Sequence, residues 1–159
     1  MLAKTLLPVA AVAALGLLAS QSTGTVTVNT ALLQSVLKEL DQPNESLKEE
    51  DGTTTLVMGI NDVSVQLYQF PDSKGTDSLK LNAGWDFDKG PSLQAVNEFN
   101  AKHRFARAYL DAEGDPFLVS DLDLKGPVSR DAIKNFILRY RLLVPLFVKE
   151  VLNGKSQQN

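Results

Sequence analysis

The chain contains no cysteine and only one histidine among its 159 residues. The lack of cysteine excludes disulfides, thiolate catalysis, thiolate metal sites and acylation of a lipoprotein cysteine. It is compatible with an oxidising compartment without indicating one. The 16 basic and 19 acidic side chains are interleaved and leave a net charge of −3. Nucleic acid is therefore a poor candidate partner, because phosphate binding requires a clustered basic surface.

Motifs for catalysis and metal binding are also missing. The sequence has no Gly-rich phosphate loop, no GxSxG and no HExxH. His103 has no partner at a recognisable spacing, and Asp121 with Asp123 has no nucleophile or cleft signature nearby. The acidic residues 49–51 and 111–115 predict solvated turns, since the second segment lacks the glycine offset and closing Glu of a calcium loop. We predict a protein that is not an enzyme and uses no metal or cofactor.

The first twenty residues, MLAKTLLPVAAVAALGLLAS, predict a secretory signal peptide. Lys4 and the α-amino group are positive, Leu6 to Leu18 are apolar, and small residues follow at Ala19 and Ser20. The uncharged run is shorter than the roughly 20 apolar residues that span a bilayer. An uncleaved anchor and a buried helix remain alternatives, and cleavage after residue 22 or 24 is also compatible with the pattern. Cleavage predicts a periplasmic or secreted protein that meets the membrane only transiently.

Three segments place apolar residues at helical spacing behind a good capping residue. They are residues 31–40 after Thr30, 93–102 after Ser92, and 130–152 after Ser129. Residues 21–29 are rich in Ser and Thr and predict a flexible lead-in. Residues 155–159 predict a disordered tail after the last helix.

Five further segments alternate apolar and polar residues, as strands with one buried face do. They are residues 54–60, 63–70, 79–87, 104–110 and 117–124. Asn61 and Asp62 suit a two-residue turn, whereas residues 41–52 and 71–76 contain Pro and Gly and predict loops. The order α-β-β-β-α-β-β-α predicts an α+β domain, with flanking helices on an antiparallel sheet of about five strands.

The most informative segment is residues 104–128, RFARAYLDAEGDPFLVSDLDLKGPV. It predicts a β-hairpin whose turn runs from Asp111 to Asp115, with Gly114 suited to a positive φ. One face carries small apolar residues that would pack against helices. If Asp111 lies opposite Asp115, the other face carries Phe105, Arg107, Tyr109, Phe117, Val119 and Asp121.

That second face has a binding interpretation and a structural one. Aromatic residues beside an arginine are common anchors of protein interfaces. Alternatively, a helix covers Phe105 and Tyr109, and Arg107 pairs with Asp121 across the strands. Trp85, the only tryptophan, together with Arg107 and Tyr109 would instead line a pocket for a small ligand.

The last predicted helix is unusually apolar. One stripe comprises Ile133, Phe136, Ile137, Tyr140, Val144, Phe147 and Val151, and it is widened by Leu138, Leu142, Leu146 and Leu152. The helix is therefore either enclosed in its own core or exposes a face for a partner or for a homodimer. Pro145 should remove one backbone hydrogen bond and bend the helix.

The segments VNEFN (96–100), RFARAYLD (104–111), GDP (114–116) and SDLDLKG (120–126) resemble the YbjN family of bacterial proteins. The family is described as sensory transduction regulators. The resemblance covers roughly residues 31–152 and implies a YbjN-like domain over 30–154. It also implies a fold similar to type III secretion chaperones, which are small non-enzymatic proteins that bind other proteins. It implies no catalytic residues. The chain departs from the family at Phe99 and Pro127, where the family tends to show Trp and Gly.

Together, these patterns predict an exported, non-enzymatic YbjN-like protein that is a protein-binding or regulatory module and binds a protein partner or itself. The alternative is a periplasmic small-ligand sensor. Because many relatives look cytoplasmic, the predicted signal peptide argues against a cytoplasmic regulatory or chaperone role for this chain.

Overall fold

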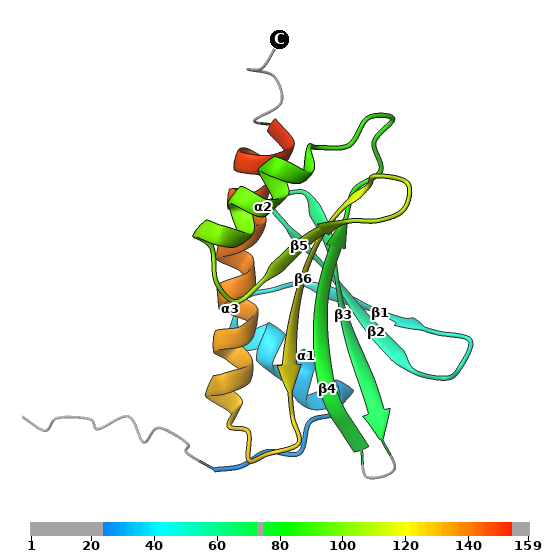
Figure 1. The fold of residues 1–159 in the computed structure, drawn as a ribbon. Coiled ribbons are helices and arrows are strands. Elements are labelled where there is room, and N and C mark those ends of the chain that lie inside the picture. The colour runs from blue at the N-terminus through cyan, green and yellow to red at the C-terminus, as the bar shows by residue number, and fades with distance from the viewer. Residues whose placement is uncertain (1–23, 73–74, 154–159) are drawn as a thin grey trace, which may run out of the picture.

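A computed structural model describes residues 24–72 and 75–153 of the chain (Figure 1). The predicted signal peptide over residues 1–20 and the predicted tail over 155–159 lie outside the described residues. The elements are α1 (Thr30–Glu39), β1 (Asn44–Lys48), β2 (Thr54–Ile60), β3 (Val63–Asp72), β4 (Gly75–Gly84), α2 (Leu93–Lys102), β5 (Arg107–Leu110), β6 (Pro116–Asp123), α3 (Arg130–Phe147) and the π-helical turn η1 (Val148–Leu152). The predicted α+β class is confirmed.

The strands form one antiparallel sheet in the order β1-β2-β3-β4-β6-β5. The sheet has six strands, one more than the predicted number of about five. The added strand is β1, which lies inside residues 41–52, the segment predicted as a loop. β1 is an edge strand with four of its five residues exposed, so it lacks the apolar alternation that identifies a half-buried strand.

Two other strand boundaries differ from the predictions. β3 and β4 continue into residues 71–76, predicted as a loop, because Pro71 is accommodated where the register shifts after Phe70. β4 ends at Gly84, so Trp85 and Phe87 follow the strand and do not belong to it. The turn at Asn61 and Asp62 is confirmed, and both residues have the positive φ (47° and 65°) of a tight hairpin turn.

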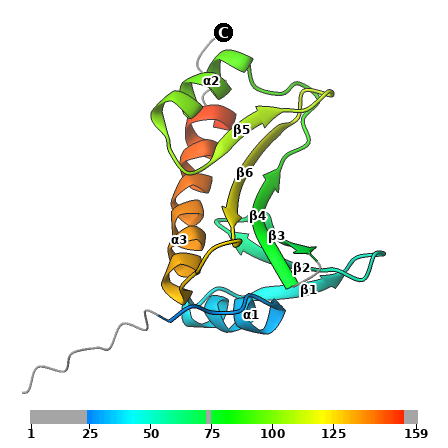
Figure 2. The ribbon, with the colours of Figure 1, turned by 60° about the horizontal axis from the view of Figure 1, so that its bottom comes forward.

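The helices lie together on one side of the sheet (Figure 2). α3 packs across β6 and β4, while α2 packs on β5 and on η1. The predicted stripe of the last helix faces the sheet, and all seven of its residues are buried. Tyr140 is fully buried in this core and its hydroxyl donates to the Leu118 carbonyl at 2.6 Å. Burial raises the pKa of Tyr140 well above its usual value, so the phenol stays protonated.

The helix starts follow local capping chemistry. The side chains of Ser92 and Ser129 accept hydrogen bonds from Ala95 N and Ala132 N, as predicted. The first helix starts one residue earlier than predicted, because Asn29, not Thr30, caps it by accepting from Leu32 N at 2.9 Å. Pro145 lies within α3, and the helix changes to the π-helical turn η1 three residues later.

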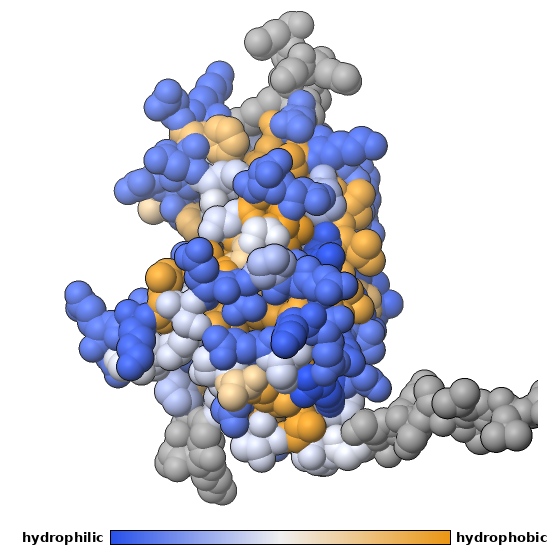
Figure 3. Space-filling view, turned by 180° about the vertical axis from the view of Figure 1, so that it is seen from behind, coloured by the Kyte–Doolittle hydropathy of each residue, from blue (hydrophilic) through white to orange (hydrophobic). Residues whose placement is uncertain are grey.

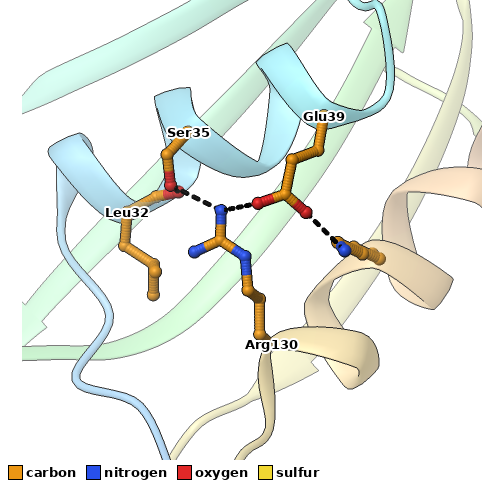
Figure 4. A network of polar contacts seen from close by, with 5 residues as sticks. Leu32, Ser35, Glu39 and Arg130 are labelled. Atoms are coloured by element: carbon orange, nitrogen blue, oxygen red, sulfur yellow. Dashed lines mark hydrogen bonds and ion pairs between the residues drawn. The ribbon is translucent and has the colours of Figure 1, made fainter. Parts of the chain in front are cut away.

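A polar network joins α1 to the start of α3 (Figure 4). The Arg130 guanidinium donates to the Glu39 carboxylate and, at 2.7 Å, to the Ser35 hydroxyl, while Lys134 forms a second ion pair with Glu39. Hydrogen bonds from Arg130 and Lys134 hold the pKa of Glu39 below its usual value. The network connects the end of α1 to the first turns of α3.

The segment before α1 is attached to the fold where the structure describes it. Thr25 forms an isolated β-bridge with Ser129, and Val26 N donates to Val128 O at 2.9 Å. Val28 is 7% exposed and joins the core. The chain therefore enters the domain beside the N-terminus of α3. None of the helices within 24–72 and 75–153 combines the length and apolar character needed to cross a membrane.

Candidate functional site

One face of the sheet is free of helices in the described part of the chain, and we call it the open face (Figure 2). The strand register places one row of side chains across it, namely Val57, Gln66, Asn82, Val119 and Arg107. Asn82 and Val119 are nevertheless buried, with 9% and 0% exposure. Neighbouring side chains therefore cover these two positions on the open face.

A layered aromatic stack lies at the β5 end of this face. Tyr109 and Phe117 are cross-strand partners, as predicted, and their rings stack at 5.2 Å with an interplanar angle of 10°. The Phe117 ring lies over Gly84, where an added Cβ would be 2.4 Å from the ring. The Arg107 guanidinium is 5.9 Å from the Tyr109 ring centre. Arg107 is exposed and the two rings are half-buried, so this stack offers contact area as well as rigidity.

Arg107 and Asp121 do not pair across the strands. Arg107 lies opposite Val119, as predicted, while the cross-strand partner of Asp121 is Lys80. No ion pair of Arg107 falls within 4 Å among the described residues. The predicted alternative, in which Arg107 pairs with Asp121 across the strands, is therefore wrong. The hydrogen-bond donors of the guanidinium are not used by that carboxylate.

Phe105 does not belong to the open face. β5 begins only at Arg107, and Phe105 precedes it with a φ of 71°. The Ser120 hydroxyl donates to the Phe105 carbonyl at 2.6 Å and fixes this turn. The predicted pairing of Phe105 with Asp121 is therefore wrong, because the alternating pattern was extended past the true start of the strand. The ring instead lies near Arg139 of α3.

Trp85 is separated from Arg107 and Tyr109. Its ring packs against Phe147 of α3 with centres 5.1 Å apart, and the residue is partly buried against the core. The structure therefore does not bring these three residues together around one ligand. Trp85 does contribute to the rim of a neighbouring hollow.

That hollow lies beside the aromatic stack and has a volume of about 330 Å³. Its lining comprises Ser64, Gln66, Asn82, Gly84, Trp85, Asp86, Asp115 and Phe117. The carboxamides of Asn82 and Gln66 hydrogen-bond to each other at 3.2 Å, and the Tyr68 hydroxyl donates to Gln66 at 2.8 Å. Partial burial and the charge of Glu49 raise the pKa of Tyr68, which keeps this donor protonated. The hollow thus has a polar side next to an aromatic wall.

Other candidate residues have structural partners. The His103 ring lies 3.1 Å from the Glu150 carboxylate and packs against the Phe99 ring at a tilt of 37°, so it joins α2 to η1. The Asp111 carboxylate accepts from Glu113 N and Asp115 N, which orders the hairpin turn. Within the described residues, no group of three His, Asp or Glu side chains is arranged to hold a metal ion.

Sequence reasoning missed two residues that shape this region. Asn100 of α2 donates to Ala108 O at 2.9 Å and accepts from Ala108 N at 2.8 Å, so its side chain pairs with the outer edge of β5. Arg139 of α3 reaches the Phe105 ring. Asn100 lies in VNEFN (96–100), one of the segments that resemble the family, and this resemblance was a usable signal. Arg139 follows Phe105 by many residues, and no local pattern connects the two.

Comparisons with known proteins concern the fold and the family. Among proteins of curated function, none matches this chain. A crystal structure of YbjN from E. coli, titled "a putative transcription regulator", superimposes with a TM-score of 0.55 and 10% identity, covering 80% of this chain and 98% of that chain. That identity shows the fold alone.

Two further solved structures have TM-scores of 0.49. The type III secretion chaperone SycH of Yersinia pestis, in complex with a stable fragment of YscM2, shares 20% identity and covers 76% of this chain and 98% of its own. An uncharacterised protein of Methanothermobacter thermautotrophicus shares 17% identity, with 77% and 98% covered.

The family is established from the sequence itself. A model of the family described as "Putative bacterial sensory transduction regulator" matches residues 29–151. These residues run from the cap of α1 into η1, so the match spans the whole described domain apart from its ends. The chain belongs to the YbjN family.

Proposed function

We propose that this chain is an exported, non-enzymatic protein-binding module that regulates its partner through the open face. The observation that carries the proposal is the stack of Gly84, Phe117, Tyr109 and Arg107, a rigid aromatic layer with an exposed guanidinium that has no acidic partner among the described residues. Aromatic and arginine side chains in such an arrangement are enriched at the centres of protein interfaces. The family description as a regulator agrees with this class of function.

Preorganisation supports the choice of this surface. The Phe117 ring rests on Gly84 and on the Tyr109 ring, so neither aromatic side chain has to be ordered on binding. Avoiding that ordering cost retains about 0.5–1.5 kcal/mol per immobilised side chain. The proposed site comprises Arg107, Tyr109 and Phe117, with Asp121 at its margin and the hollow beside it.

The test is crosslinking and pull-down of the tagged chain, expressed with its own N-terminal residues in the source cell. Arg107→Ala and Tyr109→Ala should each reduce recovery of a specific partner, while circular dichroism shows an unchanged fold. Lys149→Ala, an exposed charge on the helical side, is the matched control and should change nothing. Equal recovery by all variants would contradict the proposed face, and recovery of the chain alone would indicate self-association.

Export is the second part of the proposal and rests on the pattern of residues 1–20. Fusion of residues 1–24 to a phosphatase that is active only outside the cytoplasm tests it. Activity that disappears when Leu6 to Leu18 are interrupted by charged residues is the expected result. A fusion that stays inactive and cytoplasmic would restrict the proposal to the folded domain.

A small-ligand sensor is the second candidate function. The hollow favours it, because the rim contains Trp85 and one side offers the carboxamides of Gln66 and Asn82. The fluorescence of the only tryptophan should then shift on titration with a metabolite panel. Asn82→Ala should abolish the shift, and a flat response across the panel would remove this candidate.

A further inference from the structure

A second surface lies on the helical side of the molecule, around Phe105. The chain between α2 and β5 runs beside the middle of α3 in both ribbon views (Figures 1 and 2). There, the Arg139 guanidinium is 4.4 Å from the centre of the Phe105 ring, and that of Arg104 is 5.0 Å from it. Phe105 is still 54% exposed, so the two cations do not remove the ring from solvent.

The backbone at Phe105 adopts a conformation that aromatic residues rarely take. Its φ of 71° is in the left-handed region, which costs a non-glycine residue roughly 1–2 kcal/mol. The hydrogen bond from Ser120 holds the turn there. Such strain is retained where the surrounding structure fixes it, and it clusters at functional sites. A core contact does not explain it here, because the ring lies outside the core.

The charges of this surface are unbalanced. Neither Arg104 nor Arg139 forms an ion pair within 4 Å among the described residues, although the protein carries more acidic than basic groups. A planar guanidinium presents five donors that match a carboxylate in a two-point geometry. Two such groups beside one aromatic ring therefore suit a ligand that places carboxylates next to an apolar side chain.

Apolar side chains continue the surface along the outside of α3. Leu142 is 69% exposed and follows Arg139 by three residues, so both side chains lie on one face of the helix. Leu138 is 38% exposed one turn before Leu142, and both leucines also line a hollow together with Gln42, Gly59 and Ile60. Viewed from behind, apolar groups show along the edge of the molecule where α3 lies (Figure 3). The surface thus combines apolar and cationic character.

From this combination we infer that Phe105, Arg104, Arg139 and Leu142 form a docking site for an acidic peptide segment of a partner protein. Carboxylates of the segment pair with the two guanidiniums, and an adjacent apolar side chain of the segment packs on Phe105 and Leu142. The site is separate from the open face and needs none of its residues. It extends the proposed function by naming the chemistry of one bound segment.

The test is selection of a random peptide library on the immobilised protein, followed by fluorescence anisotropy with the enriched peptides. The expected sequences carry Asp or Glu beside a large apolar residue, and their affinity should fall as the salt concentration rises. Arg104→Gln combined with Arg139→Gln should weaken binding about tenfold, as expected for two partly exposed charged contacts. Lys149→Gln, which removes an exposed charge farther along the same side of the molecule, should leave affinity unchanged.

Phe105→Asn separates binding from folding. Asparagine tolerates a positive φ better than phenylalanine does, so the variant should keep or gain stability while it loses peptide affinity. Tyr109→Ala should leave peptide affinity unchanged, and this distinguishes the site from the open face. Several results would overturn the inference: enrichment of non-acidic peptides, equal enrichment on the double arginine variant, binding only to anionic vesicles, or self-association that occupies the surface.

Discussion

Replacing Asn100 by alanine should loosen the outer edge of the sheet at β5. The side chain makes two hydrogen bonds with the backbone of Ala108, at 2.8 and 2.9 Å, and Ala108 is 3% exposed. Two bonds of about 0.5–1.5 kcal/mol each are worth about 1–3 kcal/mol together. Alanine regains up to about 0.7 kcal/mol through its higher helix propensity. The net loss of unfolding free energy should therefore be about 0.3–2.3 kcal/mol.

Urea unfolding followed by the fluorescence of Trp85 measures this loss, because that ring packs against Phe147 and reports the core. Asn97→Ala is the matched control, since Asn97 is exposed on the same helix and gains the same propensity. Hydrogen exchange of the Ala108 amide gives a local measure, and exchange should accelerate only in Asn100→Ala. Equal stability of the two variants, with the Ala108 amide still protected, would refute the reasoning.

Asn100→Asp adds a pH test to the same contact. The carboxylate still accepts from Ala108 N but faces the Ala108 carbonyl oxygen without a proton to donate. Its ionised form is therefore disfavoured in the fold, and the pKa of the new carboxyl should lie above the usual value. The stability lost at neutral pH should return as the pH falls through that raised pKa. A loss that is constant with pH would show that the carbonyl is not the group it faces.

The structure predicts the direction in which three further substitutions change stability or binding. Tyr140→Phe should lower the unfolding free energy by about 1–2 kcal/mol, because Leu118 O loses a buried donor, and a denaturant midpoint unchanged from the parent would contradict this. Gly84→Ala should displace the Phe117 ring at a cost of about 1–3 kcal/mol and reduce partner recovery, and intact stacking in the near-ultraviolet circular dichroism would refute the close approach. The pKa of Glu39 is lowered in the fold, so its ion pairs stabilise the protein above the usual Glu pKa and lose that effect as the pH falls through the folded value. Glu39→Gln should therefore reduce the loss of unfolding free energy at acid pH. An unchanged loss would show that other carboxyl groups cause it.

Local chemistry predicted much of this fold from the sequence. The Ser92 and Ser129 caps, the Asn61 turn and the pairing of Tyr109 with Phe117 depend on neighbouring residues, and the structure has them. β1 was missed because an exposed edge strand is held by backbone pairing with β2 and shows no apolar period. Its charged residues are typical of protected edges.

The candidate site was only partly predictable for a related reason. Alternation along a strand identifies its face but not its first residue, so Phe105 was assigned to a strand that starts at Arg107. The contact between Phe105 and Arg139, and the Phe117 ring lying over Gly84, join segments far apart in the sequence. Such contacts follow from how helices and strands pack, which a single sequence does not encode locally.

The two margins of the sheet are chemically different. At β5, the Asn100 carboxamide occupies the backbone groups of Ala108 that another strand would use. At β1, the other edge strand, no described residue pairs a side chain with the backbone in this way. The Asn100 side chain therefore hinders extension of the sheet by an incoming strand at β5. A polypeptide that adds a strand to this domain would meet no such side chain beside β1, at the end of the sheet opposite the aromatic stack. Strand addition at β1 and side-chain binding at the aromatic stack would therefore use opposite ends of the sheet.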